Sequence, residues 1–353
     1  MYTKKVFSIK EMALWTRYES LLFLIIAIVE VALFVYSHHM IQFPFTPVAL
    51  IGTAVAFIIG FQSNSAYGRI WEARKIWGSI VNTSRTFGMM TQDFINNEHA
   101  KNPVSEEELK NIHKTVIYRH IAWMTALRYA MRQPRSWEYV MNEKTNKEWA
   151  NKIYVPEFNE DFDTTINQYL KQEDINYLKN KSNKQTALLY IQSKHLQELK
   201  KQGFIWEFSF LELENILEEL FTHQGKSERI KNFPYPRQFA SLLHYFTWIF
   251  MLILPLAMAS QFGEIAVKIS QKVGGNIQDW IVWLSIPFSM AVMWVFFTMN
   301  RIGRVGENPF EGSANDVPIS AIARGIEIDM RQNLGESENE IPKPFEMRND
   351  VQM

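Results

Sequence analysis

The chain has 353 residues, and its 37 Lys and Arg residues balance 37 Asp and Glu residues. A zero net charge offers no basic surface for nucleic acid, and the absence of cysteine excludes disulfides and thiolate metal sites. The mean hydropathy of −0.16 is typical of a soluble protein, but the apolar residues are gathered into long blocks.

Four of these blocks approach or reach the roughly 20 apolar residues that a helix needs to cross a membrane. In chain order we predict membrane-spanning helices at 20–36, 44–62, 240–262 and 280–300. The alternative is a set of buried helices in a soluble protein. The second and fourth blocks carry no charged residue, and uncharged runs of this length are difficult to cover in a soluble core.

Glu30 is a carboxylate at membrane depth within the first block. Ionisable residues in such places are costly and are usually functional or paired. Glu30 also lies near the predicted outer end of its helix, where a side chain can reach toward the interface instead. The sequence leaves both roles open.

Basic residues predict the orientation of the chain. Lys and Arg flank the start of the first span, the end of the second, the start of the third and the end of the fourth. The loop at 37–45 contains no Lys or Arg. Because positive residues are retained on the cytoplasmic side, we expect both termini and the segment between the second and third spans to be cytoplasmic.

The predicted cytoplasmic part, 63–239 and 301–335, has helical patterns. Apolar residues between Leu213 and Phe221 recur at helical spacing, and Ser105 with Glu108 forms a capping box. Another helix is expected from Asp316 to Gly335, with Pro318 in its first turn. No run alternates at the period of a strand, so little sheet is expected. We predict the longest loops at 142–183, and a polar tail at 336–353 that is disordered or draped over a neighbour.

The second span carries the most informative pattern. Thr53, Phe57 and Phe61 are spaced four apart and share one helix face. Small residues, including Gly52 and Gly60, would let other helices approach closely. A helix of this kind repeated around an axis would line an apolar constriction. The same stripe could also pack ordinarily against other helices, and spacing alone favours the second interpretation.

Features of an enzyme or a cofactor site are missing from the sequence. No cluster of histidines and carboxylates lies in or beside the spans. The Gly-rich loop from Gly306 to Asp316 lacks the GK[ST] ending of a phosphate-binding loop, and its acids are too sparse for a calcium cage. We therefore predict no catalytic residue, no cofactor and no bound metal.

Four separated stretches of the chain resemble the bestrophin family, specifically its bacterial branch, and they occur in the family's order over residues 1–335. They are GFQSNSAYGRIWEARKIW (Gly60 to Trp77), ERIKNFPYP (Glu228 to Pro236), NPF (Asn308 to Phe310) and NDVPISAIARGIEIDM (Asn315 to Met330).

This resemblance implies an all-α membrane protein: a homopentamer in a bacterial inner membrane, with one channel domain over 1–335 and one central pore. It implies a pore neck at Thr53, Phe57 and Phe61, and a cytoplasmic aperture near Gln185 and Thr186. It also implies structural roles for the matching motif residues, namely Arg69, Trp71, Glu72, Arg74, Asn308, Pro309, Phe310 and Asp316.

Some positions depart from the family pattern. Thr53 stands where an apolar residue is usual, so the neck should wet more easily at that point. Animal members bind calcium after the NPF motif, whereas here Ser313 replaces an acid and Val305 replaces an amide. These replacements weaken the expectation of calcium gating.

The resulting functional prediction is passive conduction of monovalent anions, chloride among them, across the lipid bilayer. Aromatic rings have a positive edge and a negative face, so Phe edges turned toward the axis would favour anions. Two alternatives remain: a monovalent cation channel of the same fold, passing sodium, and a membrane scaffold that does not conduct.

Overall fold

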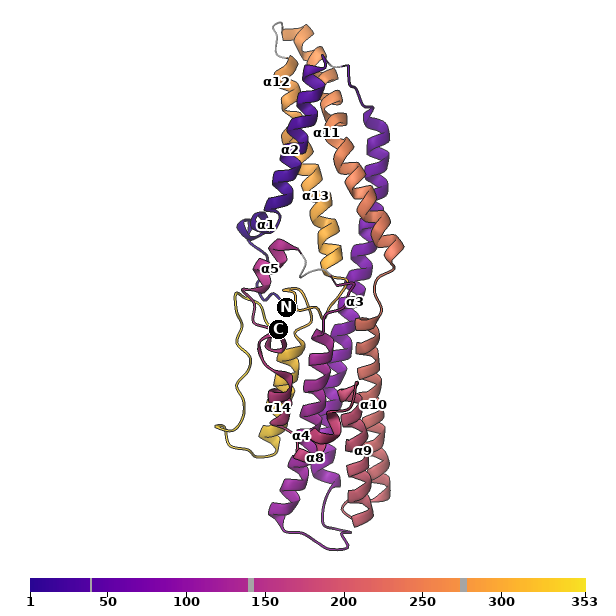
Figure 1. The fold of residues 1–353 in the computed structure, drawn as a ribbon, viewed down its shortest axis with the longest axis vertical. Coiled ribbons are helices and arrows are strands. Elements are labelled where there is room, and N and C mark those ends of the chain that lie inside the picture. The colour runs from indigo at the N-terminus through magenta and orange to yellow at the C-terminus, as the bar shows by residue number, and fades with distance from the viewer. Residues whose placement is uncertain (39, 139–142, 274–277) are drawn as a thin grey trace. The chain divides into compact units, whose positions relative to one another are not determined.

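The computed structural model describes residues 1–38, 40–138, 143–273 and 278–353. Over these residues the chain is helical, and β structure is limited to two isolated bridges, which pair Val351 with Tyr2 and with Arg348. The helices (Figure 1) are α1 (Ile9–Trp15), α2 (Arg17–Tyr36), α3 (Phe45–Phe94), α4 (Glu106–Arg132), α5 (Lys144–Ala150), α6 (Pro156–Asn159), α7 (Phe162–Asn167), α8 (Gln172–Leu178), α9 (Lys184–Gln202), α10 (Glu207–Asn232), α11 (Arg237–Val273), α12 (Gln278–Trp283), α13 (Ser285–Val305) and α14 (Ile319–Asn333).

The chain packs as two compact units. The first, the polar unit, contains residues 1–4, 69–233 and 308–353. The second, the apolar unit, contains residues 5–68 and 234–307. Helix α3 contributes its first half to the apolar unit and its second half to the polar unit.

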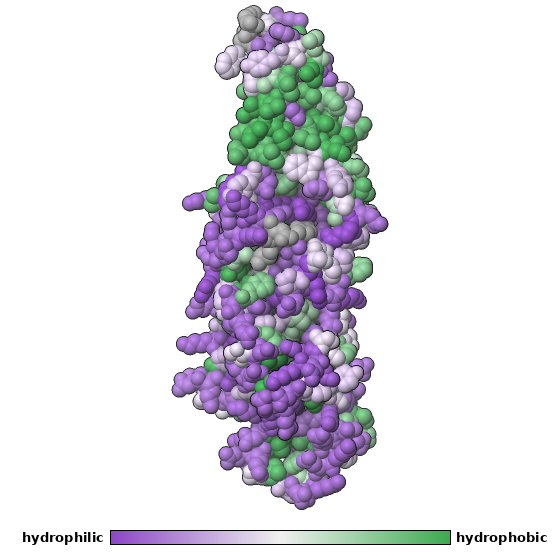
Figure 2. Space-filling model, in the orientation of Figure 1, coloured by the Kyte–Doolittle hydropathy of each residue, from purple (hydrophilic) through white to green (hydrophobic). Residues whose placement is uncertain are grey.

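Four helical stretches are long and apolar enough to cross a membrane: Arg17–Tyr36, Phe45–Phe94, Glu207–Lys272 and Gln278–Val305. Each overlaps one of the spans predicted from the sequence, and three of them contain it completely. Figure 2 shows a band of hydrophobic residues across the visible face, with more hydrophilic residues above and below it. The prediction of an all-α protein with four apolar helices is therefore confirmed.

Within the apolar unit, α2, α11, α12 and α13 lie against one another (Figure 1). Phe23, Met251 and Met293 are fully buried where α2, α11 and α13 meet. Helices α2 and α11 are so close that a Cβ atom on Gly263 would lie 2.9 Å from the Phe34 ring. Close contact of this kind favours a small residue between membrane helices.

Helix α4 is the centre of the polar unit. It packs against α9, α10, α14 and α7, and its buried residues include Val116, Ile117 and Leu127. The predicted capping box starts this helix, because the Ser105 hydroxyl accepts a hydrogen bond from the Glu108 amide at 3.2 Å and the Glu108 carboxylate accepts one from the Ser105 amide. In the apolar stripe of α10, Leu213 and Leu220 are buried, whereas Phe221 at its end is exposed.

Two expectations for the polar unit were wrong. The segment predicted to hold the longest loops instead forms the short helices α5 to α8. Helices of four to seven residues are too short to show a readable period. The expected loop includes Asn142, which lies outside the described residues.

The tail after Gly335 was expected to be disordered or draped over a neighbour, but it packs on its own unit. Val351 and Met353 are buried, the Phe345 ring lies 4.3 Å from the Arg324 guanidinium, and the Met353 carbonyl accepts a hydrogen bond from the Ala321 amide at 2.7 Å. A few apolar side chains are sufficient to pack this tail against its unit. The average composition of the tail is polar and therefore does not reveal them.

The last helix was predicted to start near Asp316. It starts at Ile319, with Pro318 as its N-cap residue. Asp316 instead closes the preceding loop. The predicted end is accurate, since α14 ends at Asn333 and Gly335 then takes a positive φ of 76°, a conformation that glycine adopts without strain.

Candidate pore-lining site

The first half of α3 exposes the predicted pore stripe. Phe57 is 67% exposed and Phe61 is 69% exposed, although both belong to an apolar helix in which Val55 and Ile59 are buried. Helical periodicity explains the difference, because Val55 and Ile59 lie on the opposite face, against the other helices of the unit. Each phenyl ring therefore projects from the protomer instead of filling its core.

Thr53, the third member of the stripe, is also exposed. Its hydroxyl donates a hydrogen bond to the Ala49 carbonyl at 2.9 Å, one turn earlier in the same helix. This bond satisfies the hydroxyl without a partner from elsewhere. A threonine can therefore occupy an apolar helix face while presenting its methyl group and a weakly polar oxygen.

The stripe lines an open groove between α3, α11 and α13. The groove encloses about 810 Å³. Its wall is almost wholly apolar, and polar side chains enter it only from Thr53 and Asn64. The residues that line it are Phe45, Ala49, Gly52, Thr53, Ala56, Phe57, Gly60, Phe61, Asn64, Phe250, Leu254, Met258, Val292 and Phe296.

Two glycines in this groove have different surroundings. A Cβ atom on Gly52 would lie 2.7 Å from the Phe250 ring, so glycine there lets α11 approach α3. At Gly60 no described atom lies within 4 Å of the Cβ position. Gly60 therefore faces the open side of the groove, next to Phe57 and Phe61.

The motif residues after the neck lie in the polar unit. The Arg69 guanidinium donates to the carbonyls of Ile230 and Phe233 at 2.9 and 3.0 Å. These carbonyls belong to the last turn and the C-cap of α10, where unsatisfied oxygens attract a cation. Arg69 thus binds the carbonyls at the end of α10.

Other residues of this motif are more exposed. Glu72 forms an ion pair with Arg229 in which both side chains are largely exposed, and such a pair contributes little stability. Trp71 is exposed, and so is Arg74. Within the protomer, Trp71 and Arg74 are surface residues, and their exposure gives no evidence of a packing role.

The loop containing the NPF motif is tied down by internal contacts. Phe310 is buried in the core of the polar unit, the Pro309 carbonyl accepts the Val317 amide at 3.2 Å, and the Asn308 amide donates to Glu311 at 3.4 Å. The Asp316 carboxylate accepts hydrogen bonds from the Gly312 and Ser313 amides at 2.6 and 3.1 Å, so it closes the loop on itself.

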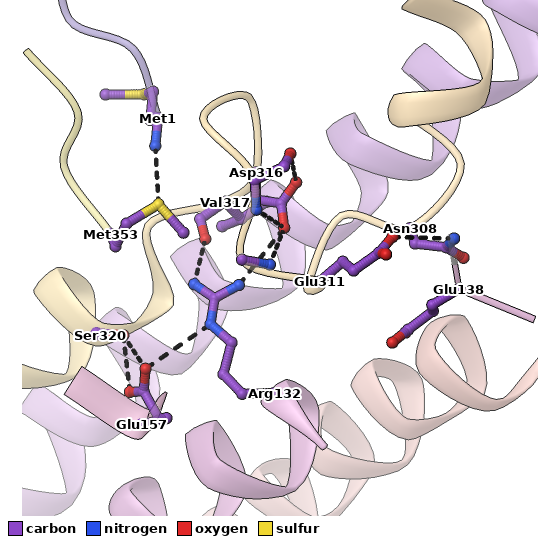
Figure 3. Close-up of polar contacts among 12 residues, drawn as sticks. Met1, Arg132, Glu138, Glu157, Asn308, Glu311, Asp316, Val317, Ser320 and Met353 are labelled. Carbon is purple, nitrogen blue, oxygen red and sulfur yellow. Dashed lines mark hydrogen bonds and ion pairs between the residues drawn. The ribbon is translucent and has the colours of Figure 1, made fainter. Parts of the chain in front are cut away.

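A buried arginine also contacts this carboxylate. Arg132, fully buried on α4, lies between Asp316 and Glu157 (Figure 3), with distances of 3.5 Å to Asp316 and 3.8 Å to Glu157. The Ser320 hydroxyl donates to Glu157 at 2.7 Å. The Arg132 guanidinium therefore places positive charge beside the Asp316 carboxylate. Among the described residues, no group of three His, Cys, Asp or Glu side chains is placed to hold a metal.

The residues predicted for the aperture lie at the start of α9. Gln185 is only 8% exposed, and its amide donates to Glu228 at 2.9 Å. The Thr186 hydroxyl accepts a hydrogen bond from the Gln224 amide at 2.7 Å. Both side chains are therefore engaged with α10 within the protomer.

Sequence and structure comparisons agree on the relatives of this chain. The family described as Bacterial/Fungal Bestrophin protein matches residues 11–273 and 276–332. "Voltage-dependent anion channel-forming protein YneE" of Escherichia coli strain K12 is 24% identical over 305 residues, covering 86% of this chain and 81% of that protein. "Voltage-dependent anion channel-forming protein mll4386" of Mesorhizobium japonicum is 23% identical over 84% of this chain and 77% of its own length.

Among solved structures, a bacterial bestrophin homologue from Klebsiella pneumoniae shares the fold, with a TM-score of 0.71 and 19% sequence identity. The alignment covers 91% of this chain and 98% of that one. The family match extends over nearly the whole chain and includes the stretches that carry the pore stripe and the NPF motif. The chain therefore belongs to the bacterial and fungal bestrophin family.

Proposed function

We propose that this protein is an anion channel: a homopentamer in a bacterial inner membrane that conducts monovalent anions, chloride among them, through a central pore. Residues 1–335 would form one channel domain, with 63–239 and 301–335 in the cytoplasm together with both termini. The neck would be formed by Thr53, Phe57 and Phe61, and the cytoplasmic aperture by Gln185 and Thr186.

The exposure of Phe57 and Phe61 is the observation that carries this proposal. Burying a phenylalanine side chain is worth about 1.5–3 kcal/mol, yet both rings are left two-thirds exposed on the groove. A stripe used for packing within the protomer would be buried, as Phe250 is. Further copies of the chain around an axis would instead turn these rings toward a shared pore.

An apolar neck of this kind holds no fixed charge and controls ions through dehydration and weak fields. A phenyl edge is positive and a phenyl face is negative. Rings that extend from closely packed helices have little room to lie flat, so edges toward the axis are favoured, and edges favour anions. The names of the relatives, anion channel-forming proteins, support the same choice.

The test is the reversal potential of the purified protein in planar bilayers under a sodium chloride gradient. A reversal near the chloride equilibrium potential is expected. A reversal near the sodium potential would keep the channel but overturn the argument about ring edges. An assembled, folded oligomer that passes no current would favour the membrane scaffold instead, and a protomer that stays monomeric would refute the pore.

A further inference from the structure

Glu30 is the single Asp, Glu, Lys or Arg residue in the four predicted spans, 20–36, 44–62, 240–262 and 280–300. A charged group at such depth is costly unless it has a partner. In the structure the Glu30 carboxylate accepts a hydrogen bond from the backbone amide of Leu256, on α11, at 3.0 Å. Glu30 is therefore bound to a neighbouring helix, which argues against the role of reaching toward the interface.

The position of this amide has a simple cause. Pro255 lies inside α11, where proline supplies no N–H group and its ring collides with the carbonyl four residues earlier. Proline opens the backbone hydrogen-bond ladder at that turn and bends the helix. The amide of Leu256, next in sequence, can then turn to a side-chain acceptor, and the Glu30 carboxyl group provides one.

Hydrogen bonds through Ser260 hold the same turn of α11. The Leu256 carbonyl accepts the Ser260 hydroxyl at 3.0 Å, and the Ser260 oxygen accepts the Phe43 amide, just before α3, at 3.0 Å. A chain of hydrogen bonds thus joins α2, the turn of α11 that follows Pro255, and the entrance to α3. Leu254 and Met258, on either side of Leu256, line the groove that contains Phe57.

We propose that Glu30 is a positioning residue for the pore. By accepting the Leu256 amide it fixes the bend of α11 at Pro255, and this bend sets where Leu254 and Met258 stand beside the neck helix. The inference rests on the proposed function, because a groove that is not part of a pore would have no conductance to set.

The test uses the full-length protein in four variants: Glu30→Ala, Glu30→Gln, Pro255→Ala and the double variant Glu30→Ala with Pro255→Ala. Glutamine keeps an acceptor oxygen at the same reach. Alanine at 255 restores an N–H group and removes the ring, so the turn no longer depends on an outside acceptor. Glu264→Ala, on the same helix but beyond the predicted span, is the matched control.

Two measurements are made on each variant: amide hydrogen exchange of peptides covering Leu256, and single-channel conductance in planar bilayers. Glu30→Ala should speed exchange roughly tenfold, the upper end of the factor expected for losing one hydrogen bond, and should change the conductance. Glu30→Gln should stay close to the wild type. In the Pro255→Ala background, removing Glu30 should have little further effect on either measurement.

Unchanged exchange and conductance in Glu30→Ala would overturn the proposal, and so would an effect that persists in full without Pro255. Faster exchange with normal conductance would show that Glu30 holds the Leu256 amide but does not position the pore. If the wild-type oligomer itself passes no current, the proposed function fails, whereas the exchange data still report whether Glu30 holds the bend.

Discussion

Replacing both neck phenylalanines tests the pore assignment most directly. Phe57→Ala with Phe61→Ala removes two phenyl rings from each copy of α3. Because each ring is already about two-thirds exposed in the protomer, the change should cost it less than about 2 kcal/mol of folding free energy in total, a third of the burial value for two phenylalanines. The double variant should therefore fold.

The effect on ions should be larger than the effect on stability. The interaction of a cation with the face of one aromatic ring is worth about 0.5–1 kcal/mol at an exposed site. We take the interaction of an anion with a ring edge to be of the same order, and each subunit around a pore would contribute two rings. Losing only 1.4 kcal/mol of that discrimination changes the permeability ratio about tenfold. We therefore expect a higher single-channel conductance and at least a tenfold weaker preference for chloride over sodium.

The assay is the reversal potential and single-channel conductance under a sodium chloride gradient, with oligomeric state checked by mass. Phe288→Ala is the matched control, because Phe288 is 57% exposed on α13 and does not line the groove. It should leave the currents unchanged. If the double variant assembles and conducts like the wild type, these two residues do not form the neck.

Three further predictions concern stability. Glu157→Ala should cost about 3–5 kcal/mol in chemical unfolding, because it leaves the buried Arg128 and Arg132 without their shared carboxylate; a loss below about 1 kcal/mol would refute this. Burial lowers the pKa of His120 from 6.5 to about 3, so the unfolded chain takes up this proton first. His120 should then contribute a fall in stability of about 1.4 kcal/mol per pH unit between pH 6.5 and 3, and the unfolding free energies of the wild type and His120→Gln should differ by this contribution. Gly52→Ala should destabilise the protein by about 1–3 kcal/mol, since its Cβ meets an α11 ring at 2.7 Å, whereas Gly60→Ala should fold normally; equal melting temperatures for the two glycine variants would count against the packing described for the groove.

The sequence predicted the elements that depend on long regular patterns. The four apolar helices follow from block length, and the shared face of Thr53, Phe57 and Phe61 follows from their spacing. Exposure of that face could not be read from spacing, because a packed stripe and a pore stripe have the same period. The arrangement of α11 and α13 beside α3 shows that this face is exposed in the protomer.

The buried charges of α4 were missed for a related reason. Arg119, Arg128 and Arg132 resemble residues of a solvated helix face, yet all are buried. Their partners are far along the chain: Arg119 pairs with Asp174 at 2.8 Å, and Arg132 with Asp316 at 3.5 Å. Glu30, a carboxylate within a predicted span, likewise predicts a partner, but its sequence position does not identify that partner as the Leu256 amide.

One copy of this chain can supply only one wall of a pore. The face that carries Phe57 and Phe61 is open, and the groove beside it is bounded by helices of the same protomer. A pore needs that face repeated around an axis, with each copy meeting its neighbours through two different surfaces, the kind of contact that closes into a ring. Assembly and conduction should therefore be lost together: a variant that stays monomeric should carry no current, whatever residues it keeps in the neck.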